Sequence, residues 1–160
     1  MRPPQQPETL PEPDELLKHF KNLLCFISDS PTDTLFSEEA DRYIEENFTV
    51  DSLDQNITLQ ECRRVLKRLS NGKSAGIDSI PSEFLKQAEP IISPFLVKLF
   101  NVILNSGHYP KEWAEAIICP IYKSGDKNDP ENYRGISLLP VVGKVFDIIM
   151  DNRLRIWENE

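Results

Sequence analysis

Two basic residues, Lys123 and Arg134, have the side chains and the spacing to bind a polyphosphate together. Each borders a short apolar segment, and the loop that joins the two segments is rich in Asp, Asn, Gly and Pro. If the segments pair as a β-ribbon, both cations lie on its arms, where a guanidinium can bind two phosphate oxygens and an ammonium adds a movable point charge. The alternatives are an ordinary turn lysine and, for Arg134, an ion pair with Asp126 or Glu131.

A second group of basic residues lies on a helix predicted to begin after Thr58. Thr58 and Glu61 have the spacing of a capping box, and apolar residues follow at three- and four-residue intervals. Such cations can neutralise the backbone phosphates of a bound nucleic-acid strand, although a solvated helix face is often as basic. The cations on the other side of this helix and just after it are Arg63, Arg64, Lys67, Arg68 and Lys73.

Other kinds of site are excluded by their spacing. Gly72-Lys73-Ser74 ends like a phosphate-binding P-loop, but Lys67 stands where that motif needs glycine, and a helix replaces the preceding strand. The cysteines, Cys25, Cys62 and Cys119, are far apart in apolar surroundings, and only two histidines are present. We therefore expect buried reduced thiols, with neither a zinc site nor a disulfide framework.

The elements that position these residues are mostly helices. The expected fold class is α+β, mainly α, with amphipathic helices and a small antiparallel β-ribbon. In the ribbon, residues 116–119 and 136–139 form the strands. The first two expected helices cover 14–27 and 37–48, and the third runs from Thr58 to Asn71-Gly72. A fourth begins near Pro81, with Ser79 as its N-cap. A long core helix with a broad apolar face runs from Pro90 or Pro94 to Gly107, and a last helix begins at Pro140.

Composition divides the chain into a disordered Pro-rich lead-in (1–13), an acidic helical linker (14–57) and a partial domain (58–160). The net charge of −8 is uneven: residues 1–60 hold 4 basic and 13 acidic residues, whereas residues 61–160 hold 14 and 13. The acidity of the whole chain therefore does not argue against a nucleic-acid partner for the last 100 residues.

No apolar run approaches the roughly 20 residues of a membrane span, and no secretory signal is recognisable, so we expect an intracellular protein with no membrane partner.

Several segments, taken in order, resemble motifs of one family. They are Asn71–Pro81, Pro120–Lys123, Gly125-Asp126 and Asn132–Leu139. Together they are similar to the reverse transcriptase (RNA-directed DNA polymerase) of LINE-type, non-LTR retrotransposons of the jockey kind. The resemblance implies that 58–160 form the fingers of a right-hand polymerase, that Lys123 and Arg134 hold the triphosphate of a deoxynucleotide, and that the basic helix contacts an RNA template or primer-template.

Polymerisation also needs two divalent metals held by clustered carboxylates. In the family these carboxylates belong to the palm, and their motifs fall after residue 160, so the sequence predicts a fingers fragment that is inactive alone. Mg²⁺ is expected only for the complete polymerase, and apolar faces of the last helix and the ribbon are expected to be exposed. The alternative function is a non-catalytic helical module, derived from such an element, that binds nucleic acid or protein.

Overall fold

The computed structural model describes residues 10–24 and 51–159, which form two compact units. One unit contains residues 10–24 and 118–136, and the other contains 51–117 and 137–159. The expected helix over 37–48, Cys25 and most of the Pro-rich lead-in lie outside the described residues.

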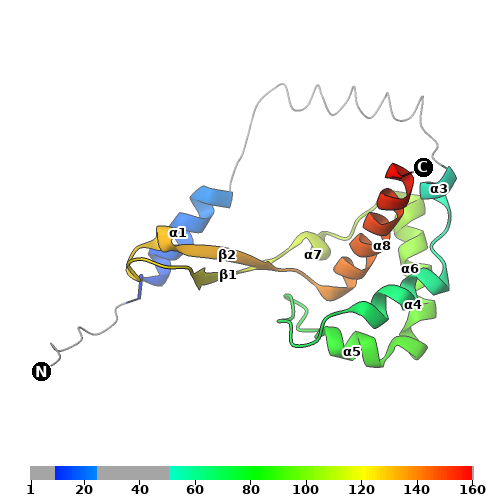
Figure 1. Ribbon diagram of the computed structural model, residues 1–160, viewed down its shortest axis with the longest axis horizontal. Coiled ribbons are helices and arrows are strands. Elements are labelled where there is room, and N and C mark those ends of the chain that lie inside the picture. The colour runs from blue at the N-terminus through cyan, green and yellow to red at the C-terminus, as the bar shows by residue number, and fades with distance from the viewer. Residues whose placement is uncertain (1–9, 25–50, 160) are drawn as a thin grey trace, which may run out of the picture. The chain divides into compact units, whose positions relative to one another are not determined.

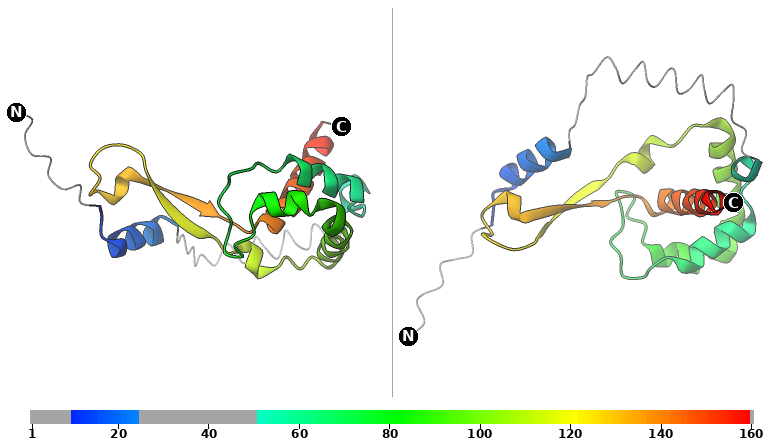
Figure 2. Two further views of the ribbon diagram at one scale, coloured as in Figure 1. Left: turned by 90° about the horizontal axis from the view of Figure 1, so that it is seen from below. Right: turned by 45° about the horizontal axis from the view of Figure 1, so that its top comes forward.

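The second unit is built on helices α4 (Leu59–Arg68), α6 (Glu89–Ser106) and α8 (Val141–Glu158), with α4 packed against both of the others (Figures 1 and 2). Three short helices complete it. They are α3 (Asp51–Asp54), α5 (Ser82–Gln87) and α7 (Lys111–Ala114). Its apolar core comprises Ile57, Cys62, Val65, Leu66, Leu85, Phe100, Ile103, Val141, Val145, Phe146 and Ile149.

Helix α4 begins as the sequence predicts and ends earlier. The Thr58 side chain accepts a hydrogen bond from the Glu61 amide, and the Glu61 carboxylate accepts one from the Thr58 amide, which confirms the capping box. Leu69 leaves the helical conformation, so the expectation that Gly72 ends this helix is wrong. Gly72, at φ +69°, instead lies in the turn that follows.

The next two helix boundaries depend on proline and glycine. Ser79 adopts φ 56° and is not the N-cap of α5, contrary to expectation; Pro81 holds that place. Helix α6 starts at Glu89 with Pro90 in its first turn, where the missing amide hydrogen costs nothing. Gly107, in the left-handed conformation at φ 66°, ends α6 as predicted.

Helix α6 buries only part of its apolar surface. Phe100 is fully buried and contacts the rings of Trp113 and Phe146. On another side of the helix, four apolar residues are exposed, so the expected broad core face is wrong for that side. These residues are Ile91, Phe95, Leu99 and Val102.

Strands β1 (Ile117–Tyr122) and β2 (Tyr133–Leu138) form an antiparallel two-stranded ribbon, which with the helices confirms the predicted mainly helical α+β class. Both strands are longer than expected, and the short helix η1 (Pro130–Asn132) leads into β2. Helix α1 (Pro13–Leu24) contacts η1 (Figure 1). Its Phe20 side chain lies against Gly135 and Ile118 of the ribbon. Within the described residues, no helix is both long and apolar enough to cross a membrane.

Candidate nucleic-acid interface

The pairing of the ribbon fixes the side on which Lys123 and Arg134 project. The Lys123 amide donates to the Asn132 carbonyl at 2.8 Å, and the rings of Tyr122 and Tyr133 touch, with centroids 5.6 Å apart. In this register Lys123 and Arg134 are diagonal neighbours on one face, because side chains alternate along each strand. The other face carries Ile118 and Pro120, which line a small cavity with Phe20 of α1.

Neither cation on this face is neutralised by a described neighbour. Both side chains are exposed. Among the described residues, Arg134 forms no ion pair with Asp126 or Glu131, the alternative left open by the sequence. The ribbon thus presents two positive groups to solvent on the side away from α1.

The loop between the strands is held by residues of the recognised motif. The Asn132 amide group donates to the Asp126 carbonyl at 2.9 Å, and the Tyr133 hydroxyl donates to the Lys127 carbonyl at 2.9 Å. From β1, the Tyr122 hydroxyl donates to the Gly125 carbonyl at 2.7 Å. Gly125, at φ +100°, has the Asn132 side chain against it, with no room for a Cβ. These residues shape the loop, and Lys123 and Arg134 border it.

Two of the five cations predicted to bind a template are engaged with the buried carboxylate of Glu89. The Arg63 guanidinium lies 2.8 Å from one Glu89 oxygen, and its Nε also donates to the Ser93 hydroxyl at 3.3 Å. The Lys67 ammonium lies 4.0 Å from the other Glu89 oxygen. Glu89 is only 6% exposed, so these cations also serve to compensate a buried charge.

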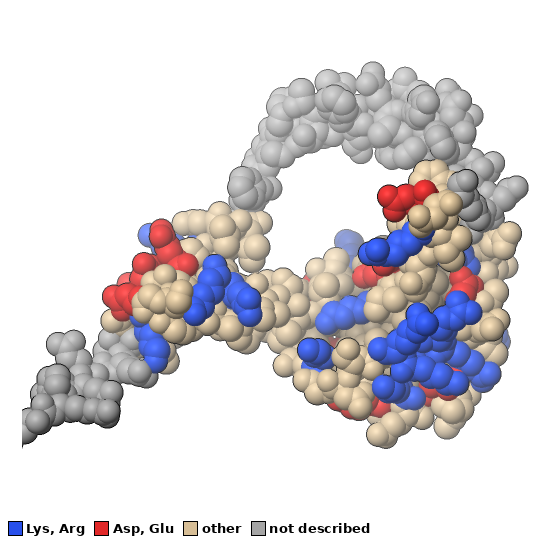
Figure 3. All heavy atoms as spheres, in the orientation of Figure 1, with Lys and Arg blue, Asp and Glu red and all other residues tan. Residues whose placement is uncertain are grey.

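The other three, Arg64, Arg68 and Lys73, are exposed and form no ion pair with a described residue. Arg64 and Arg68 line a cavity of about 590 Å³ together with residues of α8. Figure 3 shows Lys and Arg side chains gathered over α4. The other residues lining this cavity, which the sequence did not single out, are Asn152, Arg155 and Ile156 of α8 and Asn159, the C-cap of α8.

The segment after α4 is anchored at Gly76. A Cβ on Gly76 would lie 2.4 Å from the carbonyl carbon of Leu139 and 2.5 Å from the nitrogen of Pro140. The backbone of the first recognised motif therefore touches the backbone just before α8. The Asp78 carboxylate accepts a hydrogen bond from the Ile80 amide at 3.1 Å, which shapes the turn before α5.

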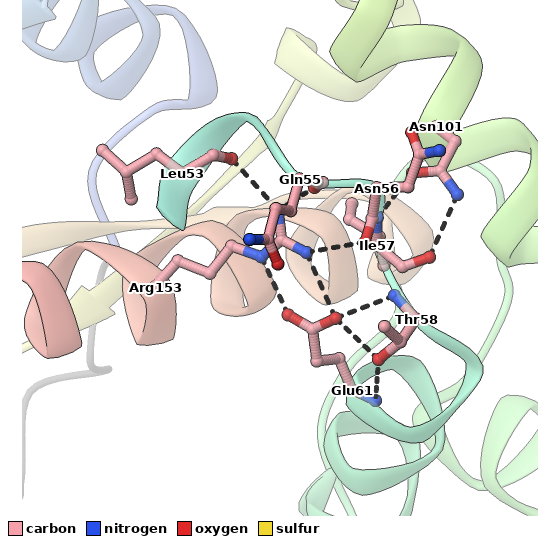
Figure 4. A network of polar contacts seen from close by, with 8 residues as sticks. All are labelled: Leu53, Gln55, Asn56, Ile57, Thr58, Glu61, Asn101 and Arg153. Atoms are coloured by element: carbon pink, nitrogen blue, oxygen red, sulfur yellow. Dashed lines mark hydrogen bonds and ion pairs between the residues drawn. The ribbon is translucent and has the colours of Figure 1, made fainter. Parts of the chain in front are cut away.

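A buried arginine on α8, missed by the sequence analysis, supports the start of α4 (Figure 4). Arg153 is 8% exposed and donates to both oxygens of Glu61, at 2.8 and 3.1 Å. Burial raises the pKa of Glu61, but hydrogen bonds from Arg153 and Thr58 outweigh it and lower the pKa to about 2. Arg153 follows Ile149 by one helical turn, and this inward position was the available signal.

The described residues contain no group of three or more His, Cys, Asp and Glu placed to hold a metal ion. Of the cysteines, Cys62 is fully buried, and burial together with the nearby Glu89 raises the pKa of its thiol to about 11. Cys119 is partly exposed and is also unpaired.

Sequence comparisons identify relatives of this chain. It is 31% identical to the RNA-directed DNA polymerase from mobile element jockey of Drosophila melanogaster over 117 residues, which is 72% of this chain and 13% of that protein. It is 39% identical over 90 residues to a 115 kDa protein in the type-1 retrotransposable element R1DM, also of Drosophila melanogaster, covering 55% of this chain and 9% of the relative. The jockey polymerase of Drosophila funebris matches at 32% over 99 residues, 61% of this chain and 11% of the relative.

No family model matches the chain. The matched segments are a small part of each relative, between 9% and 13% of its length. They nevertheless confirm the class predicted from the motifs: the chain is related in sequence to the RNA-directed DNA polymerases of non-LTR retrotransposons.

Proposed function

We propose that this chain is a fingers segment of a non-LTR reverse transcriptase that binds the RNA template or primer-template through α4 and the triphosphate of a deoxynucleotide through Lys123 and Arg134. Mg²⁺ serves the complete polymerase, where carboxylates outside the described residues hold it. The relatives are RNA-directed DNA polymerases by name, which supports the substrate class.

One observation carries the template part of the proposal. Arg64, Arg68 and Lys73 are exposed and form no ion pair with a described residue, in a chain whose net charge is −8. Unpaired surface cations on a helix can displace counterions from a nucleic-acid backbone, which is the main source of sequence-independent affinity. Local charge, and not the pI of the whole chain, decides such contacts.

The template contact is tested by fluorescence anisotropy with single-stranded RNA over a range of salt concentrations. We expect affinity to fall steeply as salt rises, and the combined replacement of Arg64, Arg68 and Lys73 by Gln to remove most of it. The matched control replaces Lys98 and Lys111, two exposed cations on α6 and α7, by Gln. A folded wild-type protein that binds no RNA at low salt refutes the proposal.

The nucleotide contact is tested separately with a fluorescent deoxynucleotide triphosphate in the presence of bound primer-template. Lys123→Gln and Arg134→Gln should each weaken nucleotide binding, and Arg134→Lys should restore it only in part, because lysine lacks the bidentate fork. Binding of RNA should be unchanged in these variants. Equal nucleotide affinity in wild type and the double variant would remove this role.

A second candidate function, a protein-interaction module, is favoured by the exposed apolar residues of α6. Ile91, Phe95 and Val102 are 73%, 69% and 64% exposed, on one side of the helix. Contiguous exposed apolar surface is typical of protein contacts. If this function holds, Phe95→Glu abolishes association with a protein partner that survives nuclease treatment, while leaving RNA affinity unchanged.

A further inference from the structure

A cavity of about 350 Å³ lies beside the basic face of α4, in the second unit. Its walls come from α4, residues 69–74, Ser82 of α5 and helix α8, and part of its lining is apolar. The apolar side chains are Val65, Leu69, Val141 and Ile148. A volume of this size lies within the range of small-molecule pockets, about 300–1,000 Å³.

The polar part of this cavity has the charge of a phosphate-binding site. Arg68, Lys73 and Lys144 line it, and none of the described residues that line it is acidic. Serine hydroxyls and the Asn152 amide add neutral donors and acceptors. An apolar wall beside three cations matches a ligand with a flat apolar ring and a negatively charged backbone.

The cavity shares two lining residues with the neighbouring one. Arg68 and Asn152 line both this cavity and the 590 Å³ cavity that contains Arg64 and Arg155. Cations of α4 and α8 therefore line both cavities, and Figure 3 shows basic side chains gathered over this part of the molecule. Arg155 is paired with Asp151 at 2.8 Å, but it is 71% exposed, so the pair is screened by solvent.

We propose that the cavity lined by Arg68, Lys73, Lys144 and Ile148 binds one nucleotide of a single-stranded RNA, with its base against the apolar side chains and the adjacent phosphates on the cations. The strand continues along the second cavity past Arg64. This inference rests on the proposed template-binding function and adds to it a base-accepting pocket and contacts from α8. Because the apolar wall does not read base edges, the pocket accepts different bases.

The test compares a short oligoribonucleotide with an abasic oligomer that has the same number of phosphates. The wild-type protein should bind the abasic oligomer at least about fivefold more weakly, since a bound base removes apolar surface of the cavity from water. Ile148→Ser, at a side chain that is 40% exposed, should remove this difference. Lys144→Gln should weaken both oligomers, and the control Lys98→Gln should change neither. Circular dichroism confirms that each variant is folded.

Four outcomes overturn the inference. Equal wild-type affinity for intact and abasic oligomers excludes the base pocket, as does equally tight binding of inorganic polyphosphate. If Lys144→Gln and Ile148→Ser leave affinity unchanged while Arg64→Gln, outside this cavity, lowers it, the pocket is excluded and the proposed function stands. If the wild-type protein binds no RNA, both fall.

Discussion

Arg153 and Glu61 form a largely buried ion pair, 2.8 Å between Nε and Oε1, that links the last helix to the first turn of α4 (Figure 4). The same guanidinium donates to three backbone carbonyls, those of Leu53, Gln55 and Asn56. Arginine can do this because its donors form a rigid planar fork. The helix that carries the proposed template contacts is therefore positioned by a residue distant in the sequence.

Replacing Arg153 by Met should lower the free energy of unfolding by about 3 kcal/mol, because the carboxylate of Glu61 and the three carbonyls lose a charged donor. This loss of unfolding free energy lies at the lower end of the range for broken buried ion pairs because the Glu61 side chain is 26% exposed. Urea denaturation measures the change. Arg155→Met is the matched control and should have little effect, since its pair with Asp151 is exposed. Similar midpoints for Arg153→Met and wild type would show that the network does not stabilise the fold.

The same pair should make stability depend on acid pH. The pKa of Glu61 is lowered from 4.5 to about 2 in the folded chain, so its ionised form favours folding. The contribution is complete above the unfolded pKa and is lost as pH falls from about 4.5 towards 2. We expect the stability difference between wild type and Glu61→Gln to be constant near neutral pH and to shrink across that acid range, as measured by urea midpoints. A difference that persists unchanged at the acid end would contradict the assignment.

Local rules predicted much of this fold. The Thr58–Glu61 capping box and the helix end at Gly107 depend on neighbouring residues, and both are confirmed. The inward position of Arg153 could be read from the helical spacing, but its partners could not be predicted, because they lie more than 90 residues away in the sequence. The sequence likewise could not show that Arg63 forms an ion pair with Glu89 and that Arg64 does not, because this pairing depends on how α4 packs against α6.

Gly76→Ala tests the contact between the first motif and the residues before α8. The new Cβ would lie 2.4 Å from the Leu139 backbone, and backbone cannot move away as a flexible side chain can. We expect a loss of about 1–3 kcal/mol in the free energy of unfolding, as for overpacked sites. Gly72→Asn is the control: no atom lies within 4 Å of the position of its Cβ, and asparagine tolerates the φ of +69°. Equal stability of the two variants in urea denaturation would disprove the close contact.

Two double variants on α4 should separate stability from RNA binding. Arg64→Gln/Arg68→Gln removes cations that form no ion pair with a described residue, so RNA affinity should fall while the urea midpoint stays unchanged. The slope of log affinity against log salt should decrease in magnitude by about 0.7 for each lost phosphate contact. Arg63→Gln/Lys67→Gln leaves the buried carboxylate of Glu89 unpaired, which should lower the free energy of unfolding by about 1–3 kcal/mol. Its effect on RNA affinity should be the smaller of the two, because these cations are already partly neutralised. If both variants lower the salt slope equally and neither is destabilised, the ion pairs with Glu89 do not distinguish Arg63 and Lys67 from Arg64 and Arg68.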